Sequence, residues 1–252
     1  MKTIIAVSTS NIASKNISGI LTSKCELPSI VEVKSFEQSV LNLPLDNLKA
    51  DLIIVPSTHK SEAGVNTLTC HTTGNWSSAE MGGQARTLSI APALYLREAL
   101  LELKKQQQTK NLKYEVSLEV THHGPTPDLP VIFVEVGSSE KQWNDLTACE
   151  AVADTIYRLL TAPSEKVPVA VGFGGPHYAP TFTRRILEGE IAFGHICPKY
   201  QVDNLDEELI LQAFERTIPK PDFAFFDWKG LLSGQRNKII KILDKHKIAW
   251  KK

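Results

Sequence analysis

The 252-residue sequence predicts an α/β fold in which helices flank a mixed, mostly parallel β-sheet. Short β-branched runs alternate with longer segments whose apolar residues recur at helical spacing. Several of the predicted strands break into a loop that begins with histidine or glycine, as expected at the ligand-binding edge of such a sheet. The length and a hydrophobic content of 42% suit one domain over residues 1–252.

The first half of the chain is predicted to contain three strands and two helices. Apolar, β-branched runs at residues 3–7, 30–36 and 52–56 predict the strands. Residues 11–21 and 89–108 predict the helices, because each segment has a residue that can cap its N-terminus and apolar residues at helical spacing.

The second half repeats the alternation. Its predicted strands are apolar runs, at residues 113–120, 131–136, 169–173, 191–195 and 223–226. Its predicted helices are amphipathic, at residues 145–160, 181–188, 205–217 and 233–247.

Residues 57–89 lack clear periodicity, and a loop of that length in a compact domain is usually functional. Its polar residues are candidates to line a substrate cleft: His71, Asn75, Trp76, Glu80 and Arg86. The alternative is an ordinary surface loop.

The composition predicts a cytoplasmic protein. No apolar run approaches the ~18 residues of a membrane helix, so no membrane contact is expected. The N-terminus reads as a first strand, with no secretory signal. Four widely spaced cysteines form no C-x-x-C pair, which is typical of free thiols in a reducing compartment.

The formal net charge is zero, but residues 229–252 contain eight basic residues and one acidic residue, a net charge of +7. Such a tail suggests a polyanionic partner. The predicted helix at 233–247 would point Lys238, Lys241 and Lys245 outward. The solvated face of a last helix is the alternative interpretation, and the charge pattern leaves both open.

Five of the seven histidines follow predicted strands, and the carboxyl ends of parallel strands share one edge of a sheet. These residues are His59, His122, His123, His177 and His195. Histidine titrates near neutral pH and is the commonest metal ligand. The pattern therefore predicts a hydrolytic or metal-dependent site.

Two further features accompany these histidines. Glu135 lies inside an apolar strand, where a carboxylate is expected to pair with a cation or to bind a metal. Gly174 and Gly175 precede His177 and Tyr178 at a strand-to-helix turn, where backbone N–H groups can approach a ligand. The sequence contains neither the G-x-S-x-G nor the H-E-x-x-H motif, which disfavours those two hydrolase classes.

Seven motifs stand in an order that resembles the archaeal and plant type of D-aminoacyl-tRNA deacylase. They are STH (57–59), CHTTGNW (70–76), THHGPT (121–126), EVGSS (135–139), GFGGPHYAPTFT (172–183), FGH (193–195) and DWKG (227–230). The likeness runs from the first strand to the last helix, and the combination of THHGP with GGPHYAP is specific.

The resemblance implies hydrolysis of the ester between a D-amino acid and the tRNA 3′ terminus, with two zinc ions per subunit. It also implies a core like that of peptidyl-tRNA hydrolases and purine-nucleoside-phosphorylase-like proteins. Aminoacyl-tRNA is then the expected partner, and no obligate protein partner is evident.

With this chemistry in view, the candidate residues fall into three groups. We expect His122 and His177 to be catalytic, with the amides of Gly174 and Gly175 holding an oxyanion. The expected metal ligands are His59, His123, Glu135 and His195. The expected substrate contacts are His71, Asn75, Tyr178, Arg184, Lys238 and Lys241.

Two other functions remain open at this point: a peptidyl-tRNA or nucleoside hydrolase on a similar fold, and a non-catalytic RNA-binding protein whose histidines are structural.

Overall fold

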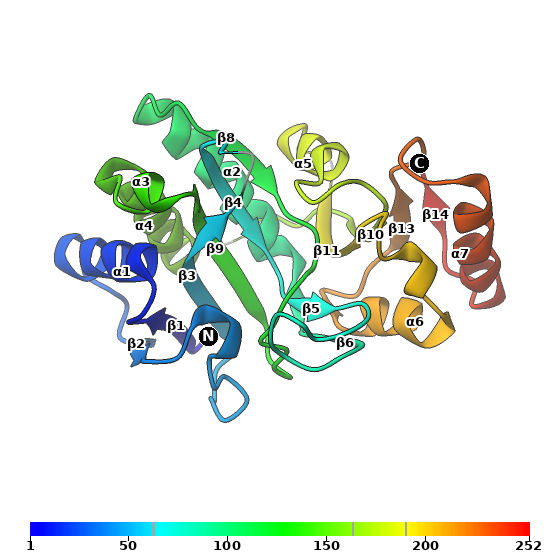
Figure 1. The fold of residues 1–252 in the computed structure, drawn as a ribbon, viewed down its shortest axis with the longest axis horizontal. Coiled ribbons are helices and arrows are strands. Elements are labelled where there is room, and N and C mark those ends of the chain that lie inside the picture. Colours follow the sequence, from blue (N-terminus) through cyan, green and yellow to red (C-terminus); the bar gives the residue numbers. More distant parts are fainter. Residues whose placement is uncertain (62–63, 163, 190) are drawn as a thin grey trace.

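The computed structural model describes residues 1–61, 64–162, 164–189 and 191–252, and its core is built on two sheets (Figure 1). The larger sheet has six strands in the order β2 (Val31–Phe36), β1 (Thr3–Ser8), β3 (Leu52–Lys60), β9 (Val131–Ser138), β4 (Thr67–His71) and β8 (Glu115–Leu118). Neighbouring strands are parallel except for the β4–β9 pair, which makes the sheet mixed.

The smaller sheet consists of four parallel strands in the order β11 (Ala192–Cys197), β10 (Val169–Phe173), β13 (Phe223–Phe226) and β14 (Trp250–Lys251). All four therefore end at the same edge. Four two-residue strands form separate pairs, β5 (Gly74–Asn75) with β6 (Thr87–Leu88) and β7 (Ala91–Pro92) with β12 (Thr217–Ile218).

Helices cover both sheets. They are α1 (Ile12–Lys24), α2 (Ala93–Thr109), α3 (Glu140–Trp143), α4 (Leu146–Thr161), α5 (Pro180–Leu187), α6 (Glu207–Glu215) and α7 (Ser233–Lys245), with 3₁₀ turns at Val40–Asn42 and Val202–Asn204. None of the helices in the described part of the chain combines the length and the apolar character needed to cross a bilayer.

Helix α2 joins the two sheets, because it packs against β4 of the larger sheet and β11 of the smaller one. One hydrophobic cluster accordingly contains Val134 of the larger sheet, Leu100 of α2, and Phe193 and Phe225 of the smaller sheet. This continuous core favours the single domain that the sequence predicts.

The predicted α/β fold with a mostly parallel sheet is confirmed. The main difference is β4, which lies in the segment 57–89 that showed no periodicity; residues 62 and 63 of that segment lie outside the described residues. All five residues of β4 are buried, and a strand buried on both faces lacks the alternation that reveals a half-exposed strand. The expected likeness to phosphorylases and peptidyl-tRNA hydrolases stays a prediction.

Candidate active site and metal centre

Five histidines and two glutamates meet beside β3, β4 and β9. We call them the histidine–glutamate cluster: His59, His71, His122, His123, His177, Glu119 and Glu135. Three of them lie on strands, since His59 is on β3, His71 is on β4 and Glu135 is on β9. The other four follow β8 and β10, so the fold gathers residues that are far apart in the sequence.

Glu119 lies at the centre of the cluster. Its side chain is fully buried, and Oε2 accepts a hydrogen bond from His177 Nε2 at 2.8 Å. The same oxygen lies 3.5 Å from His122 Nε2. Oε1 lies 3.1 Å from His59 Nδ1 but outside the alignment of a hydrogen bond. One carboxylate thus faces three imidazoles.

Glu135 is the second buried carboxylate. Its Oε2 lies 3.7 Å from His59 Nδ1 and 3.8 Å from His71 Nε2. On the other side of its ring, His59 Nε2 shares a hydrogen bond of 2.9 Å with the Tyr178 hydroxyl. His59 is therefore held between two carboxylates and a phenol.

Three imidazoles have the same tautomer fixed by the backbone. Nδ1 of His71 lies 3.0 Å from the Thr72 carbonyl oxygen, and Nδ1 of His122 lies 2.8 Å from the carbonyl oxygen of Val120. Nδ1 of His123 lies 2.6 Å from the Gly124 carbonyl oxygen. Because a carbonyl oxygen only accepts, each Nδ1 carries the proton, and Nε2 is the atom left for a ligand.

Burial and charge set the protonation of these groups in the ion-free protein. Burial lowers the pKa of His122 far below its usual value, and burial next to His71 lowers the pKa of His123 to about 4. Burial also acts to lower the pKa of His59, but Glu119 and Glu135 outweigh it and raise that pKa to about 11. The pKa of His71 moves in the same direction, since Glu135 outweighs burial there too.

The residues fit a divalent metal. Ring nitrogens of His71, His122 and His123 lie within 4.8 Å of one another. So do the ligand atoms of two further groups, His59, Glu119 and His177, and His71, Glu119 and Glu135. His71 Nε2 and Glu119 Oε1 are buried without a hydrogen-bond partner, which is costly unless a cation satisfies them. Neutral imidazole and carboxylate are typical zinc ligands.

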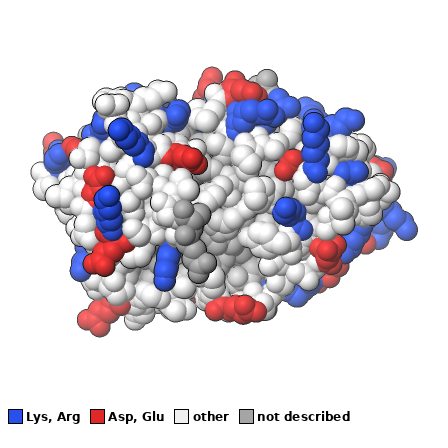
Figure 2. Space-filling model, turned by 45° about the horizontal axis from the view of Figure 1, so that its top comes forward, with Lys and Arg blue, Asp and Glu red and all other residues white. Residues whose placement is uncertain are grey.

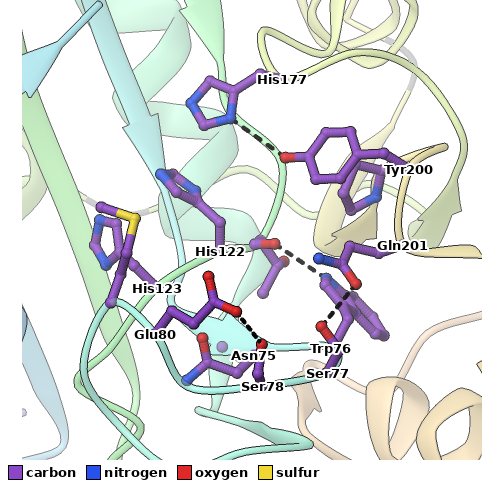
Figure 3. A pocket seen from close by; sticks show the side chains of 14 residues that line it. Asn75, Trp76, Ser77, Ser78, Glu80, His122, His123, His177, Tyr200 and Gln201 are labelled. Carbon is purple, nitrogen blue, oxygen red and sulfur yellow. Dashed lines mark hydrogen bonds between the residues drawn. The ribbon is translucent and has the colours of Figure 1, made fainter. Parts of the chain in front are cut away.

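A cavity of about 260 Å³ opens next to the cluster (Figure 3). His122, His123 and His177 line one side of it, and Glu80 and Tyr200 reach into it from the loops. Ser77, Ser78 and Gln201 add polar groups to the lining of the cavity. The site is thus a cavity with several polar groups in its lining and, at its border, side chains that could hold a metal, the arrangement expected of a hydrolytic enzyme.

A family model described as D-aminoacyl-tRNA deacylase matches residues 46–251. The chain belongs to this family. It is 45% identical over 225 residues to the D-aminoacyl-tRNA deacylase of Methanosarcina mazei, which covers 88% of this chain and 74% of the relative. It is 42% identical over 198 residues to the D-aminoacyl-tRNA deacylase of Thermococcus onnurineus, which covers 78% of this chain and 71% of the relative.

A crystal structure of a conserved protein of unknown function has a TM-score of 0.90 against this chain at 24% identity. The match covers 98% of this chain and 94% of that protein. It shows that the two share a fold.

Most of the histidines predicted for the deacylase site lie in the cluster, but His195 does not. It is buried on β11, where Nε2 donates to the Ser89 carbonyl oxygen at 2.9 Å and Nδ1 lies 3.2 Å from Thr121 Oγ1. Both ring nitrogens are therefore bonded within the protein, and the structure contradicts the expectation that His195 binds the metal.

The turn at Gly174 and Gly175 also differs from the expected oxyanion-binding site. Gly174 and Gly175 adopt left-handed backbone angles, with φ of 105° and 83°, as the tight turn before His177 requires. However, the Gly174 N–H donates to the Cys197 carbonyl oxygen at 2.8 Å, so it is not free to hold an oxyanion. Neither glycine lines the cavity, and both lie against the loop after β13.

The residues expected to contact the substrate lie in different parts of the structure. Asn75 lines the cavity, although its amide donates to the carbonyl oxygens of Gly82 and Gln84 and closes the loop there. His71 and Tyr178 contact the cluster directly. Arg184 on α5 lines a separate hollow, and Lys238 and Lys241 are exposed on α7.

Sequence reasoning missed two residues of the site, Glu119 and Tyr200. Glu119 stands in the apolar stretch SLEVT three residues before His122, the same signal that pointed to Glu135 in IFVEV. Tyr200 follows β11, and no local pattern distinguishes it from a surface tyrosine.

Proposed function

We propose that this chain hydrolyses the ester joining a D-amino acid to the 3′ terminus of tRNA, in the cytoplasm, with zinc held by the histidine–glutamate cluster. Membership of the deacylase family supports the reaction. The observation that carries the zinc proposal is the set of three imidazoles that turn Nε2 toward one another beside two buried carboxylates. Without a cation, the unpartnered nitrogen and oxygen would cost stability.

Two separate groups of three residues support two zinc ions per chain. His71, His122 and His123 would hold one ion, and His59, Glu119 and His177 would hold the other. This assignment moves His122 and His177 from acid–base roles to ligand roles. When bound, zinc supplies a Lewis acid that polarises the ester carbonyl and acidifies water.

The surrounding residues orient the ligands. Backbone carbonyls fix the rings of His71, His122 and His123, and the Tyr178 hydroxyl fixes His59. Such outer partners control metal affinity because they set ring direction and tautomer. Glu135 belongs to the third group of possible ligand atoms, with His71 and Glu119, and its Oε2 lies close to both His59 and His71.

The cavity residues would position the ester. Glu80 places a carboxylate where the substrate's α-ammonium group can bind. Partial burial raises the pKa of Tyr200 above its usual value, and its hydroxyl is protonated at neutral pH. That hydroxyl lies 3.5 Å from His177 Nδ1. Once water has added to the ester carbonyl carbon, the hydroxyl can donate its hydrogen to the ribose oxygen, which leaves with the electrons of the C–O bond as the tetrahedral adduct collapses.

The test is to incubate the protein with D-aminoacyl-tRNA, L-aminoacyl-tRNA and peptidyl-tRNA. We expect release of the amino acid from the D-aminoacyl substrate, with little release from the other two. Equal hydrolysis of L-aminoacyl-tRNA, or faster hydrolysis of peptidyl-tRNA, would contradict the proposal. Such a result would favour one of the other functions that the sequence leaves open.

A further inference from the structure

The carboxyl edge of the smaller sheet carries features beyond the cavity. The four parallel strands end there side by side, and each continues into a functional or exposed segment. Strand β11 leads to Pro198 and Tyr200 at the cavity, and β10 leads to the His177 turn. Strand β13 leads to Trp228, and β14 contains Trp250.

These segments contact one another along the edge. The Lys199 N–H donates to the Gly175 carbonyl oxygen at 3.0 Å, which connects the cavity loop to the β10 turn. The Asp227 N–H donates to the Phe173 carbonyl oxygen at 2.9 Å, which connects β10 to the Trp228 loop. With strands spaced ~4.8 Å apart, the path from β11 to β14 is roughly 14 Å long.

Two tryptophans at the far end form a preorganised aromatic surface. The rings of Trp228 and Trp250 lie within 9° of parallel with centres 6.0 Å apart. Arg236 fixes the loop that carries Trp228, since Nη1 donates to the carbonyl oxygens of Trp228 and Leu231 and its guanidinium carbon lies 4.6 Å from the Trp228 ring centre. Trp250 remains 37% exposed.

Positive charge lies next to this surface, and so does one carboxylate. Lys252 Nζ lies 5.1 Å from the Trp228 ring centre, and the Trp250 indole N–H donates to Asp244 Oδ1 at 3.3 Å. Lys199 and Lys229 are exposed on the neighbouring loops. Figure 2 shows basic side chains along the margin of the molecule on the side of α7.

We propose that this edge binds the single-stranded 3′ end of the tRNA substrate, with bases stacking on the Trp228–Trp250 surface while the terminal aminoacyl-adenosine enters the cavity. Aromatic rings beside lysines and arginines are how proteins hold unpaired nucleotides, because rings stack on bases and cations meet phosphates. The edge leads from the tryptophans to the cluster, so one strand can occupy both. The proposal rests on the proposed function for the identity of the RNA.

A binding measurement tests the surface independently of catalysis. A fluorescently labelled short RNA ending in CCA is titrated with the full chain, and anisotropy gives Kd. Loss of a stacked base costs ~1–3 kcal/mol, so Trp250→Ala should weaken binding about tenfold. Trp250→Phe keeps an aromatic face and should retain most of the affinity. Unchanged affinity in Trp250→Ala would overturn the proposal.

Charge variants provide a matched control. Lys229→Glu/Lys252→Glu should weaken RNA binding and reduce its salt dependence. Lys15→Glu/Lys49→Glu makes the same change in net charge at two exposed lysines outside the edge, on α1 and before β3, and should leave Kd within about twofold. Equal weakening by both pairs would mean that net charge, not this surface, determines binding.

Kinetics separate this proposal from the proposed function. D-aminoacyl-adenosine lacks the upstream nucleotides, so Trp250→Ala should raise KM about tenfold for D-aminoacyl-tRNA but not for D-aminoacyl-adenosine. A similar loss with both substrates would assign Trp250 a structural role and refute the stacking proposal. If the wild-type chain hydrolyses neither substrate, the proposed function fails, while the RNA titration still tests the surface.

Discussion

His177 is the cluster residue nearest solvent, with 35% of its side chain exposed at the border of the cavity, and it still contacts buried Glu119. We predict that His177→Ala lowers kcat for D-aminoacyl-tRNA at least ~100-fold, because even outer partners of metal ligands contribute 10- to 100-fold. His246→Ala is the control. His246 pairs with Glu207 on the exposed side of α7, and its loss should leave kcat unchanged. Near-normal turnover by folded His177→Ala would return His177 to a structural role.

His195 gives a prediction for pH. Burial lowers its pKa from 6.5 to about 4, so the unfolded chain binds a proton between those values that the folded chain does not. Stability therefore falls as pH drops through this window, by about 2 kcal/mol between about pH 7.5 and pH 5. His195→Gln should remove this contribution to the loss of stability at the lower pH. Urea unfolding at both pH values measures the free energy of unfolding. An identical pH dependence in the variant would show that His195 is not the group responsible.

The sequence located Glu135 and most of the histidines because each stands out from its neighbours. Glu135 is a charged residue inside an apolar run, and the histidines come at the ends of such runs. They did not distinguish His195 from the ligands, since it follows its strand just as the others do. The difference lies in its partners: Ser89 and Thr121 come from distant segments, and no local pattern reveals that they occupy both ring nitrogens.

At the scale of elements, α7 behaves as its sequence predicts. The helix spans Ser233–Lys245 and buries Ile239 and Leu243, while Lys238, Lys241 and Lys245 are exposed. Two of these lysines have partners, since Lys238 Nζ donates to the Asp203 carbonyl oxygen and Lys245 pairs with Glu207. Such exposed pairs contribute little to stability. The two lysines can therefore exchange these partners for phosphates at little cost.

We therefore predict that reversing Lys238, Lys241 and Lys245 to glutamate weakens tRNA binding and flattens its salt dependence. Hydrolysis of D-aminoacyl-adenosine should be almost unchanged, because that substrate lacks distant phosphates. Filter binding over a range of salt concentrations measures the first effect. Normal tRNA binding by the triple variant would identify the lysines as a solvated helix face and move the phosphate contact elsewhere, for example to Arg184 and Arg185.

The elements that the sequence predicted best are those whose apolar residues follow a local period, such as β10 and β13, whose observed bounds match the expected ones. Strand β4 was missed because it is buried on both faces. Its place in the sheet, antiparallel to β9 and parallel to β8, is decided by tertiary packing. That placement brings His71 opposite Phe133, next to the Glu135 carboxylate.

At the scale of the whole molecule, the two sheets contribute different parts of the proposed site. The larger sheet holds the core of the cluster through β3, β4 and β9, whereas the smaller sheet supplies His177 and the edge proposed to bind RNA. Local periodicity in the sequence could predict most strands of both, but not β4 or β14. It could not show that they form two sheets joined by α2, because that division depends on contacts between distant segments.

Zinc reconstitution tests the central claim most directly. The protein is stripped with a chelator and dialysed, and turnover of D-aminoacyl-tRNA is measured as zinc is added back, alongside the bound metal per chain. We predict that stripped protein is inactive, that activity returns and saturates at two zinc ions per chain, and that His71→Ala binds less zinc without unfolding. Full turnover by fully stripped protein, or zinc binding unaffected by the loss of His71, would contradict the account.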